Sequence, residues 1–487
     1  MDSNQTGFNQ GLRRVKNPER RKEKKTDMEV SSMDLEHQTM EMFLRWASEL
    51  GISDSVDSPR IRDSCLGRSL SVADFPLAGG RGLGAVRELR KGELVLKVPR
   101  SALMTTETMT AKDRKLSGAI NLHGSLSSTQ GKSSFWYPYS VHLPRDYDLL
   151  ATFGEFEKQA LQVEEAVWAA EKAIAKSQSE WKEAVTLMKE LDLKPKFQSL
   201  QAWLWASATI SSRTLHVPWD TAGCLCPVGD LFNYDAPGDD SNTSEGPERL
   251  TDGGFDEDAN AYCLYARRSY QLGEQVLLCY GTYTNLELLE HYGFMLEENS
   301  NDKVFIPLEN SLYSLASSWP EDSLYIHQDG KPSFALVSTL RLWLTPQSHR
   351  DKSVMRLVYA GSQISVKNEI IVMKWLSEKC GSVLMDLPTS VVEDTVVLGN
   401  IDKLQDPKLR LEQEEIEAFG NEVCAFLKVY RLWDANEVSG KANRMMSKWR
   451  LSVQWRLRYK RTLADCISYC NEKLNILSGT HNGTRDL

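Results

Sequence analysis

Apolar residues recur at helical spacing over two long parts of the chain. Between residues 153 and 193 they fall at three- and four-residue steps, and a further helical run covers residues 197–210. Beyond Pro307 the spacing is again helical, and a shorter helix is predicted over residues 41–50. The runs beyond Pro307 cover residues 334–344, 352–359, 369–379, 409–433 and 441–477.

Strand patterns lie on either side of the first helical part. Residues 75–99 contain two β-rich segments joined by the turn at residues 90–93, which predicts a β-hairpin. Residues 275–280 predict another strand, with Tyr280 at its end and Gly281 turning the chain.

A short helix is predicted directly after this strand. Thr284 and Glu287 have the spacing of a capping box, in which each side chain satisfies a free backbone N–H group at the helix start. The helix should extend to His291, and Gly293 suits its C-terminal end. Tyr292 is therefore expected at the end of a helix.

The order of these patterns predicts an α+β protein. A helical insert at about residues 112–210 interrupts a β-rich region, and an all-helical segment follows over residues 301–487. A chain of 487 residues should form two or three units. Residues 1–40 predict a disordered basic and polar tail, and residues 235–260 predict an acidic mobile loop.

Composition narrows the class of protein. Hydrophobic residues make up 41% and charged residues 26%, as in globular proteins, and no apolar run is long enough to predict a membrane span. The net charge of −9 argues against direct nucleic-acid binding and favours a basic protein or peptide partner. A monomer is expected.

Cysteine use and the first residues bear on the compartment. Nine scattered cysteines and the lack of a secretory signal predict reduced thiols and a location in the cytoplasm, the nucleus or both. The basic run at residues 20–25 is either a nuclear import signal or a solvated charge run. Acidic residues in the same tail disfavour plastid import. The pairs Cys224/Cys226 and Cys466/Cys470 lack the spacing and further ligands of a zinc site, so no metal is expected.

A glycine-rich segment admits two interpretations. Gly80, Gly82 and Ala85 have the spacing of a dinucleotide-binding fingerprint, but that motif should follow a strand and open a helix. Here a second turn arrives within about eight residues and β-formers flank it, which disfavours a Rossmann enzyme. The glycines instead allow the backbone to approach a ligand closely, unless they only form a turn.

Taken together, a series of short motifs resembles SET-domain protein methyltransferases, in the branch of Rubisco large-subunit lysine methyltransferase and actin-histidine methyltransferase. The resemblance implies a β-rich SET fold over residues 41–300 that contains the insert, and a C-terminal substrate-binding domain over residues 301–487. It also implies S-adenosylmethionine as the methyl donor and a protein as the substrate. The motifs are Gly80-Arg-Gly-Leu-Gly-Ala85, Lys91-Gly-Glu93, Val98-Pro99, Ser212-Arg213, Asp230-Leu-Phe-Asn233-Tyr234, Gly273-Glu274, Tyr280-Gly281, Thr284-Asn285 and Tyr292-Gly-Phe294.

The resemblance also implies roles for individual residues. Tyr280 matches the tyrosine at the transfer site, whose hydroxyl orients the acceptor amine, and Tyr292 matches a second tyrosine near the cofactor. The full set implied to bind the cofactor is Gly82, Leu83, Gly84, Arg213, Asn233, Tyr234, Tyr280 and Tyr292. Taken singly, each tyrosine could equally be a packing residue and Asn233 a turn residue.

One position departs from the family pattern. The family has Asn-His where this chain has Asn233-Tyr234, which changes the flat side chain beside the adenine. Three functions follow as hypotheses: a lysine methyltransferase acting on a non-histone protein, which we favour; a protein-histidine methyltransferase; and a protein-binding module that has lost catalysis.

Overall fold

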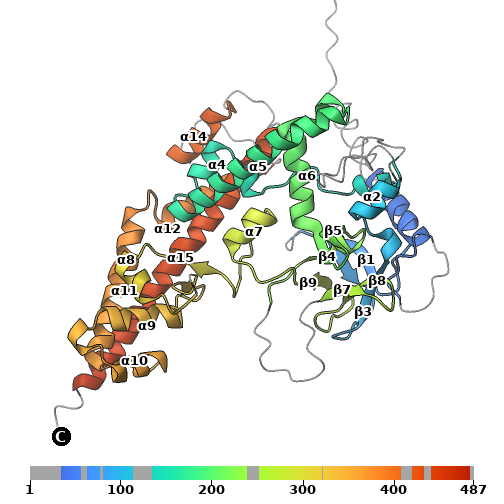
Figure 1. The fold of residues 1–487 in the computed structure, drawn as a ribbon. Coiled ribbons are helices and arrows are strands. Elements are labelled where there is room, and N and C mark those ends of the chain that lie inside the picture. The colour runs from blue at the N-terminus through green and yellow to red at the C-terminus, as the bar shows by residue number, and fades with distance from the viewer. Residues whose placement is uncertain are drawn as a thin grey trace, which may run out of the picture.

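The computed structural model describes residues 35–55, 63–76, 80–112, 134–237, 252–320, 322–406, 419–432 and 440–482. Most strands gather in one part of the molecule, and long helices form the other, where the short pair at residues 303–304 and 326–327 also lies (Figure 1). This mixture of small sheets and helices confirms the predicted α+β class, with an insert rich in helix between the strands. The start of the predicted insert and most of the predicted acidic loop lie outside the described residues.

The strands of the described residues form four small sheets. One has the order β1-β2-β9-β6, another the order β3-β8-β7, and two consist of the pairs β4-β5 and β10-β11. The strands are β1 Leu70–Phe75, β2 Gly80–Ala85, β3 Leu94–Pro99, β4 Thr214–Val217, β5 Asp220–Leu225, β6 Asn233–Tyr234, β7 Gly253–Asp256, β8 Ala261–Tyr265, β9 Gln275–Leu278, β10 Lys303–Val304 and β11 Ile326–His327.

The predicted hairpin over residues 75–99 is wrong in its pairing. β2 pairs with β1 and β9, whereas β3 pairs with β8, so the turn at residues 90–93 connects two different sheets. Leu89 pairs instead with Tyr270, which draws the chain away from β2 before β3 begins. A turn does form within residues 90–93, but the strands on either side of it pair with β9 and β8, which lie far along the chain.

Two predicted boundaries also differ from those in the structure. The helix expected over residues 41–50 covers residues 35–49, so residues 35–40 are helical and do not belong to the tail. Inside the expected loop, residues 253–256 form β7, which pairs with β8. The first residue of β7 is a glycine, which suits its close packing against β8, because a Cβ at Gly253 would lie 2.4 Å from Leu264 Cδ2.

Helices form the insert and the C-terminal part. In the insert, α5 follows the predicted apolar spacing and buries small residues such as Ala166 and Ala170. In the C-terminal part, α15 packs along α11 and α12 (Figure 1). The helices are α2 Thr106–Lys112, α3 Tyr137–Ser140, α4 Glu155–Gln159, α5 Glu164–Glu190, α6 Leu200–Arg213, α7 Asn285–His291, α8 Asn310–Leu315, α9 Phe334–Trp343, α10 Lys352–Tyr359, α11 Val366–Asp386, α12 Val391–Gln405, α14 Asn421–Val429 and α15 Gly440–Asn482.

Helix α7 joins the two parts of the molecule. Its predicted capping box is confirmed, with Thr284 accepting from the Glu287 backbone and Glu287 accepting from the Thr284 backbone. Leu289 of this helix is buried in the core that α9, α11 and α15 share, while Tyr280, just before the helix, packs on the core of the strands. The segment that carries the predicted site residues therefore lies between the two cores.

Candidate active site

The sheet β1-β2-β9-β6 brings the glycine segment next to Asn233. β9 pairs antiparallel with β2 and parallel with β6, so it separates the two strands that carry predicted cofactor residues. The Asn233 side-chain amide nevertheless reaches back and donates to the carbonyl oxygen of Arg81 at 3.3 Å. Two residues 152 positions apart in the chain are thereby joined at one end of the sheet.

Gly82 lies at a position that leaves no room for a side chain. A Cβ there would lie 2.6 Å from Gln275 Nε2 and 2.9 Å from Asn233 Nδ2. Gln275 Nε2 is itself buried and has no hydrogen-bond partner among the described residues. Amide donors thus converge on a glycine backbone, an arrangement that suits a carboxylate or another acceptor group of a ligand.

The neighbouring residues of β2 have different surroundings. The Leu83 side chain is fully buried in the core, so only its backbone can face a ligand. Gly84 lies under the ring of Phe75, which a Cβ would approach to 3.2 Å. Of the three residues predicted in this segment, Gly82 is the one that lies directly against the side-chain amides of Gln275 and Asn233.

Arg213, the last residue of α6, is held by two partners. Its Nη1 donates to the carbonyl oxygen of Asp230 at 2.8 Å and to Asp230 Oδ2 at 3.1 Å, and its Nε donates to the Tyr147 hydroxyl at 3.3 Å. The Tyr139 hydroxyl donates to the same carboxylate oxygen at 2.8 Å. Burial alone would lower the pKa of Arg213, but Asp230 and the two tyrosines raise it, so the guanidinium stays charged.

Tyr234 and Tyr280 are linked across the strands β6 and β9. The Tyr280 hydroxyl donates to the carbonyl oxygen of Phe232, just before β6, and the Tyr234 hydroxyl donates to that of Gly281 at 2.9 Å, just after β9. The two ring centroids lie 5.2 Å apart. Burial raises the pKa of Tyr280 above its ordinary value, so its hydroxyl is a neutral phenol at physiological pH.

Three further rings complete an aromatic cluster, which comprises Tyr234, Tyr280, Tyr283, Tyr292 and Phe294. The ring centroid of Tyr292 lies 5.4 Å from that of Tyr280 and 5.4 Å from that of Tyr283. The Tyr292 hydroxyl donates to the Tyr283 hydroxyl at 3.3 Å. The ring centroid of Phe294 lies 5.9 Å from that of Tyr234 and 6.0 Å from that of Tyr292. The predicted tyrosines 234, 280 and 292 therefore meet in one cluster.

Several residues of this region were not predicted as site residues. Asp230 and Phe294 stand inside the motifs already noted, and Tyr283 lies three residues after Tyr280, so their neighbourhood was a usable signal. Tyr139 and Tyr147 come from the segment before the long insert helix, and nothing in their local sequence points to Arg213. Their contacts arise only from the tertiary fold.

Other site classes were also considered. Within the described ranges, no group of three or more His, Cys, Asp or Glu side chains is placed to hold a metal ion. The nine cysteines are free thiols, and both pairs singled out in the sequence are buried. None of the described helices has an apolar stretch long enough to span a bilayer.

The small sheets, the inserted helices, and the glycine, asparagine and tyrosine residues at one sheet end define a SET-domain protein methyltransferase. The chain belongs to the SET-domain methyltransferase family, whose methyl donor is S-adenosylmethionine. It is 77% identical to Protein SET DOMAIN GROUP 40 of Arabidopsis thaliana, over 93% of this chain and 100% of that protein. A scan of protein-family models gave no match.

More distant relatives agree with the branch that the motifs resemble. Mouse actin-histidine N-methyltransferase is 27% identical over 77% of this chain and 66% of that protein. The fold is similar to the SET domain of LSMT bound to lysine and AdoHcy, with a TM-score of 0.53, 17% identity, and coverage of 91% of this chain and 92% of that one. Rubisco LSMT bound to AdoMet gives a TM-score of 0.51 at 17% identity, covering 90% of this chain and 93% of that one. The structural likeness supports the SET fold.

Proposed function

We propose that the protein transfers a methyl group from S-adenosylmethionine to a lysine side chain of a non-histone protein. The observation that carries this proposal is the neutral Tyr280 hydroxyl, which lies within an aromatic cluster and beside the carbonyl oxygen of Phe232. Aromatic faces attract a methylated ammonium group, and oxygen acceptors orient an amine. The cluster therefore suits a lysine Nζ and its methylated product.

Transfer to an amine requires a neutral nitrogen. A lysine of ordinary pKa of about 10.4 is mostly protonated at neutral pH, but removal of its Nζ from water disfavours the ammonium form. The proton leaves to solvent before transfer. The nitrogen lone pair then forms the bond to the methyl carbon as the bond from carbon to sulfur breaks. The Tyr280 phenol orients the nitrogen for this in-line geometry.

The donors around Gly82 suit the amino-acid end of the cofactor. S-adenosylmethionine supplies a methyl group on a positively charged sulfur and carries a carboxylate at one end. Gln275 Nε2 has no partner among the described residues, and Arg213 is charged and already oriented by Asp230. These groups would bind the carboxylate, while Tyr280 and Tyr292 would face the methyl group.

Histidine is the second candidate acceptor. It is supported by the 27% identity to mouse actin-histidine N-methyltransferase. A histidine of ordinary pKa of about 6.5 is mostly neutral at pH 7. Methyl transfer to a histidine nitrogen would therefore not require that the site first remove a proton from the acceptor. The identity of the methylated amino acid therefore separates the two candidates.

Methyl labelling of a cell extract tests the proposal. Wild type, Tyr280→Phe and a control variant, Tyr313→Phe, are compared with labelled S-adenosylmethionine. Tyr313 lies on α8, outside the aromatic cluster, and is 47% exposed. We expect Tyr280→Phe to label roughly 10²-fold more slowly, as when one positioned hydrogen-bonding group is removed, and the control to match wild type. Acid hydrolysis should yield methyl-lysine, whereas methyl-histidine would favour the second candidate.

Calorimetry tests the remaining hypothesis of a non-catalytic binding module. Wild type should bind S-adenosylmethionine, and Gly82→Ala should weaken that binding. If wild type shows no detectable binding at millimolar cofactor, both catalytic candidates fail. Equal labelling by wild type and Tyr280→Phe would reject the role of that hydroxyl alone.

A further inference from the structure

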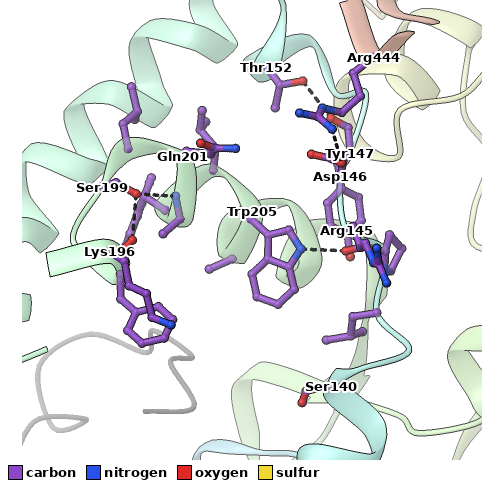
Figure 2. A pocket seen from close by; sticks show the side chains of 18 of the residues that line it. Ser140, Arg145, Asp146, Tyr147, Thr152, Lys196, Ser199, Gln201, Trp205 and Arg444 are labelled. Atoms are coloured by element: carbon purple, nitrogen blue, oxygen red, sulfur yellow. Dashed lines mark hydrogen bonds and ion pairs between the residues drawn. The ribbon is translucent and has the colours of Figure 1, made fainter. Parts of the chain in front are cut away.

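A groove of about 1180 Å³ lies between three parts of the chain. The segment after α3 forms one wall, the end of α5 and the start of α6 form another, and the first turns of α15 close it (Figure 2). Gly82, Asn233 and Tyr280 do not line this groove. Tyr147 does, and its hydroxyl accepts from Arg213, so the groove adjoins the candidate active site without being part of it.

The groove is positively charged in a protein of net charge −9. Its charged residues are Arg145, Lys196, Arg444 and Lys448, against the single acid Asp146. Asp146 pairs with Arg444 at 3.4 Å, and Lys448 donates to the carbonyl oxygen of Thr152 at 2.9 Å. Neither Arg145 nor Lys196 has an ion-pair partner among the described residues. Two exposed cations therefore remain available to a ligand.

Aromatic side chains lie between these cations. The Trp205 indole donates to the carbonyl oxygen of Pro144 at 2.8 Å, which fixes its ring, and in Figure 2 it lies between Lys196 and Arg145. Trp203 also lines the groove, and its buried Nε1 has no hydrogen-bond partner in the described part of the chain. The two tryptophans give the groove an aromatic lining near its cations.

We propose that this groove binds an acidic segment of the protein substrate that also carries aromatic side chains. Carboxylates would pair with the Arg145 guanidinium and the Lys196 ammonium, and aromatic rings would pack on Trp205. A protein segment is favoured over a nucleic acid as the occupant because the chain belongs to a family of protein methyltransferases, and the test below includes an oligonucleotide as the alternative. The inference rests on the proposed function, since it assigns the occupant to the methylated protein.

The partner predicted here differs from the one expected from net charge. An acidic chain favours basic partners on average, but binding depends on the local surface. A substrate held in the groove would lie beside Tyr147 and hence close to Arg213. Docking there would place the acceptor segment near the aromatic cluster.

A copolymer of glutamate and tyrosine, poly(Glu,Tyr), tests the groove without any methyl transfer. Its affinity for the full chain is measured by calorimetry at low and high salt, beside poly(Lys,Tyr) and a 20-nucleotide single-stranded oligo(dT). The groove variant carries Arg145→Glu and Lys196→Glu, both at exposed positions, and the control variant carries Lys367→Glu and Lys374→Glu, exposed positions on α11. Both variants change the net charge equally.

We expect wild type to bind poly(Glu,Tyr) more weakly at high salt, the groove variant to lose at least tenfold in affinity, and the control to stay within twofold. The groove inference is overturned by no binding to wild type, by equal losses in the two variants, or by tighter binding of oligo(dT) than of poly(Glu,Tyr).

A kinetic measurement connects the groove to the substrate. With the extract protein identified by methyl labelling, the groove variant should raise KM at least fivefold and leave kcat within twofold, because the aromatic cluster is intact. An unchanged KM would overturn the assignment of the occupant to the substrate. Absence of labelling by wild type would instead overturn the proposed function, while binding of poly(Glu,Tyr) could still be measured.

Discussion

Tyr234 and Tyr280 brace two parallel strands through reciprocal hydrogen bonds. Each hydroxyl donates to a backbone carbonyl beside the partner's strand, Tyr280 to Phe232 and Tyr234 to Gly281, and the rings pack 5.2 Å apart. Tyr234, the residue that departs from the family pattern, thus holds the turn that follows Tyr280. We therefore expect Tyr234 to act by positioning Tyr280.

Tyr234→Phe should reduce the rate more than the stability. The ring keeps its packing, and one hydrogen bond with a net contribution of about 1 kcal/mol is lost, while the turn at Gly281 becomes free to move. We expect kcat to fall roughly tenfold, because small misplacements of reacting groups cost up to about 10²-fold. Urea denaturation and single-turnover labelling measure the two effects.

The matched control for this brace is Tyr262→Phe, which changes a buried tyrosine of the strand core that lies outside the aromatic cluster. Its rate should equal that of wild type. If Tyr234→Phe retains full kcat, the hydroxyl has no positioning role, and Tyr234 is a packing residue.

Gly82→Ala should weaken cofactor binding. The added Cβ would come within 2.6 Å of Gln275 Nε2 and 2.9 Å of Asn233 Nδ2, so at least one amide must move. We expect the Kd for S-adenosylmethionine to rise at least tenfold in calorimetry. Gly254→Ala is the control, because a Cβ at Gly254 in β7 has no neighbour within 4 Å. Equal affinities of both variants would place the cofactor elsewhere.

The sequence predicted those elements whose signals are local. The capping box of Thr284 and Glu287 is complete within four residues, so α7 could be located to within a residue. By contrast, α12 was missed although Ser390 and Glu393 form a similar box. Its valines point in several directions, since Val392 is 72% exposed and Val397 only 8%, so no single apolar face could be recognised.

The candidate site was predictable only where its residues stand in motifs. Tyr234, Tyr280 and Tyr292 lie in such motifs, and the structure brings their rings together. The partners of Arg213 could not be predicted, because Tyr147 is 66 residues away and its position depends on the insert. The pairing of β2 with β9 is equally non-local, joining Leu83 to Val276. Pairings of this kind depend on the packed fold, which local periodicity does not encode.

Asp394→Asn should destabilise the helical part of the molecule. Arg456 and Lys460 of α15 are fully buried, and the Asp394 carboxylate pairs with both, at 2.8 Å and 2.6 Å. Arg456 keeps its pair with Glu422 at 2.7 Å, but Lys460 loses its carboxylate partner. Leaving a buried charge without its partner costs about 3–5 kcal/mol. Urea denaturation should show this loss in the free energy of unfolding.

An exposed pair on the same helix gives the comparison. Arg450 pairs with Asp402 at 2.7 Å, and both side chains are partly exposed to solvent. Asp402→Asn should cost about 0–1 kcal/mol, as for other surface pairs. Equal losses for the two variants would show that the buried network contributes no more than a surface contact.

Asp148 should make the stability of the protein depend on pH. Burial raises the pKa of Asp148 from 3.8 to about 6, although Lys448 acts in the opposite direction. The folded protein therefore binds this proton more tightly than the unfolded chain, and stability is lost as the pH rises from about 4 to 6. Asp148→Asn removes this titration, so its free energy of unfolding should increase relative to wild type across that range.

The opposite sign is expected at Asp351, the N-cap of α10. Hydrogen bonds from the Ser353 hydroxyl and the backbone of Val354 and Ser353 lower the pKa of Asp351. Its contribution to stability is present above the unfolded pKa and is lost as the pH falls, so Asp351→Asn should lose stability relative to wild type as the pH rises. Urea denaturation of Asp148→Asn at about pH 4 and pH 7, and of Asp351→Asn at about pH 2.5 and pH 5, measures the two slopes, because the pKa of Asp148 is raised from 3.8 and that of Asp351 is lowered from 3.8. Slopes of the same sign would show that burial does not control Asp148.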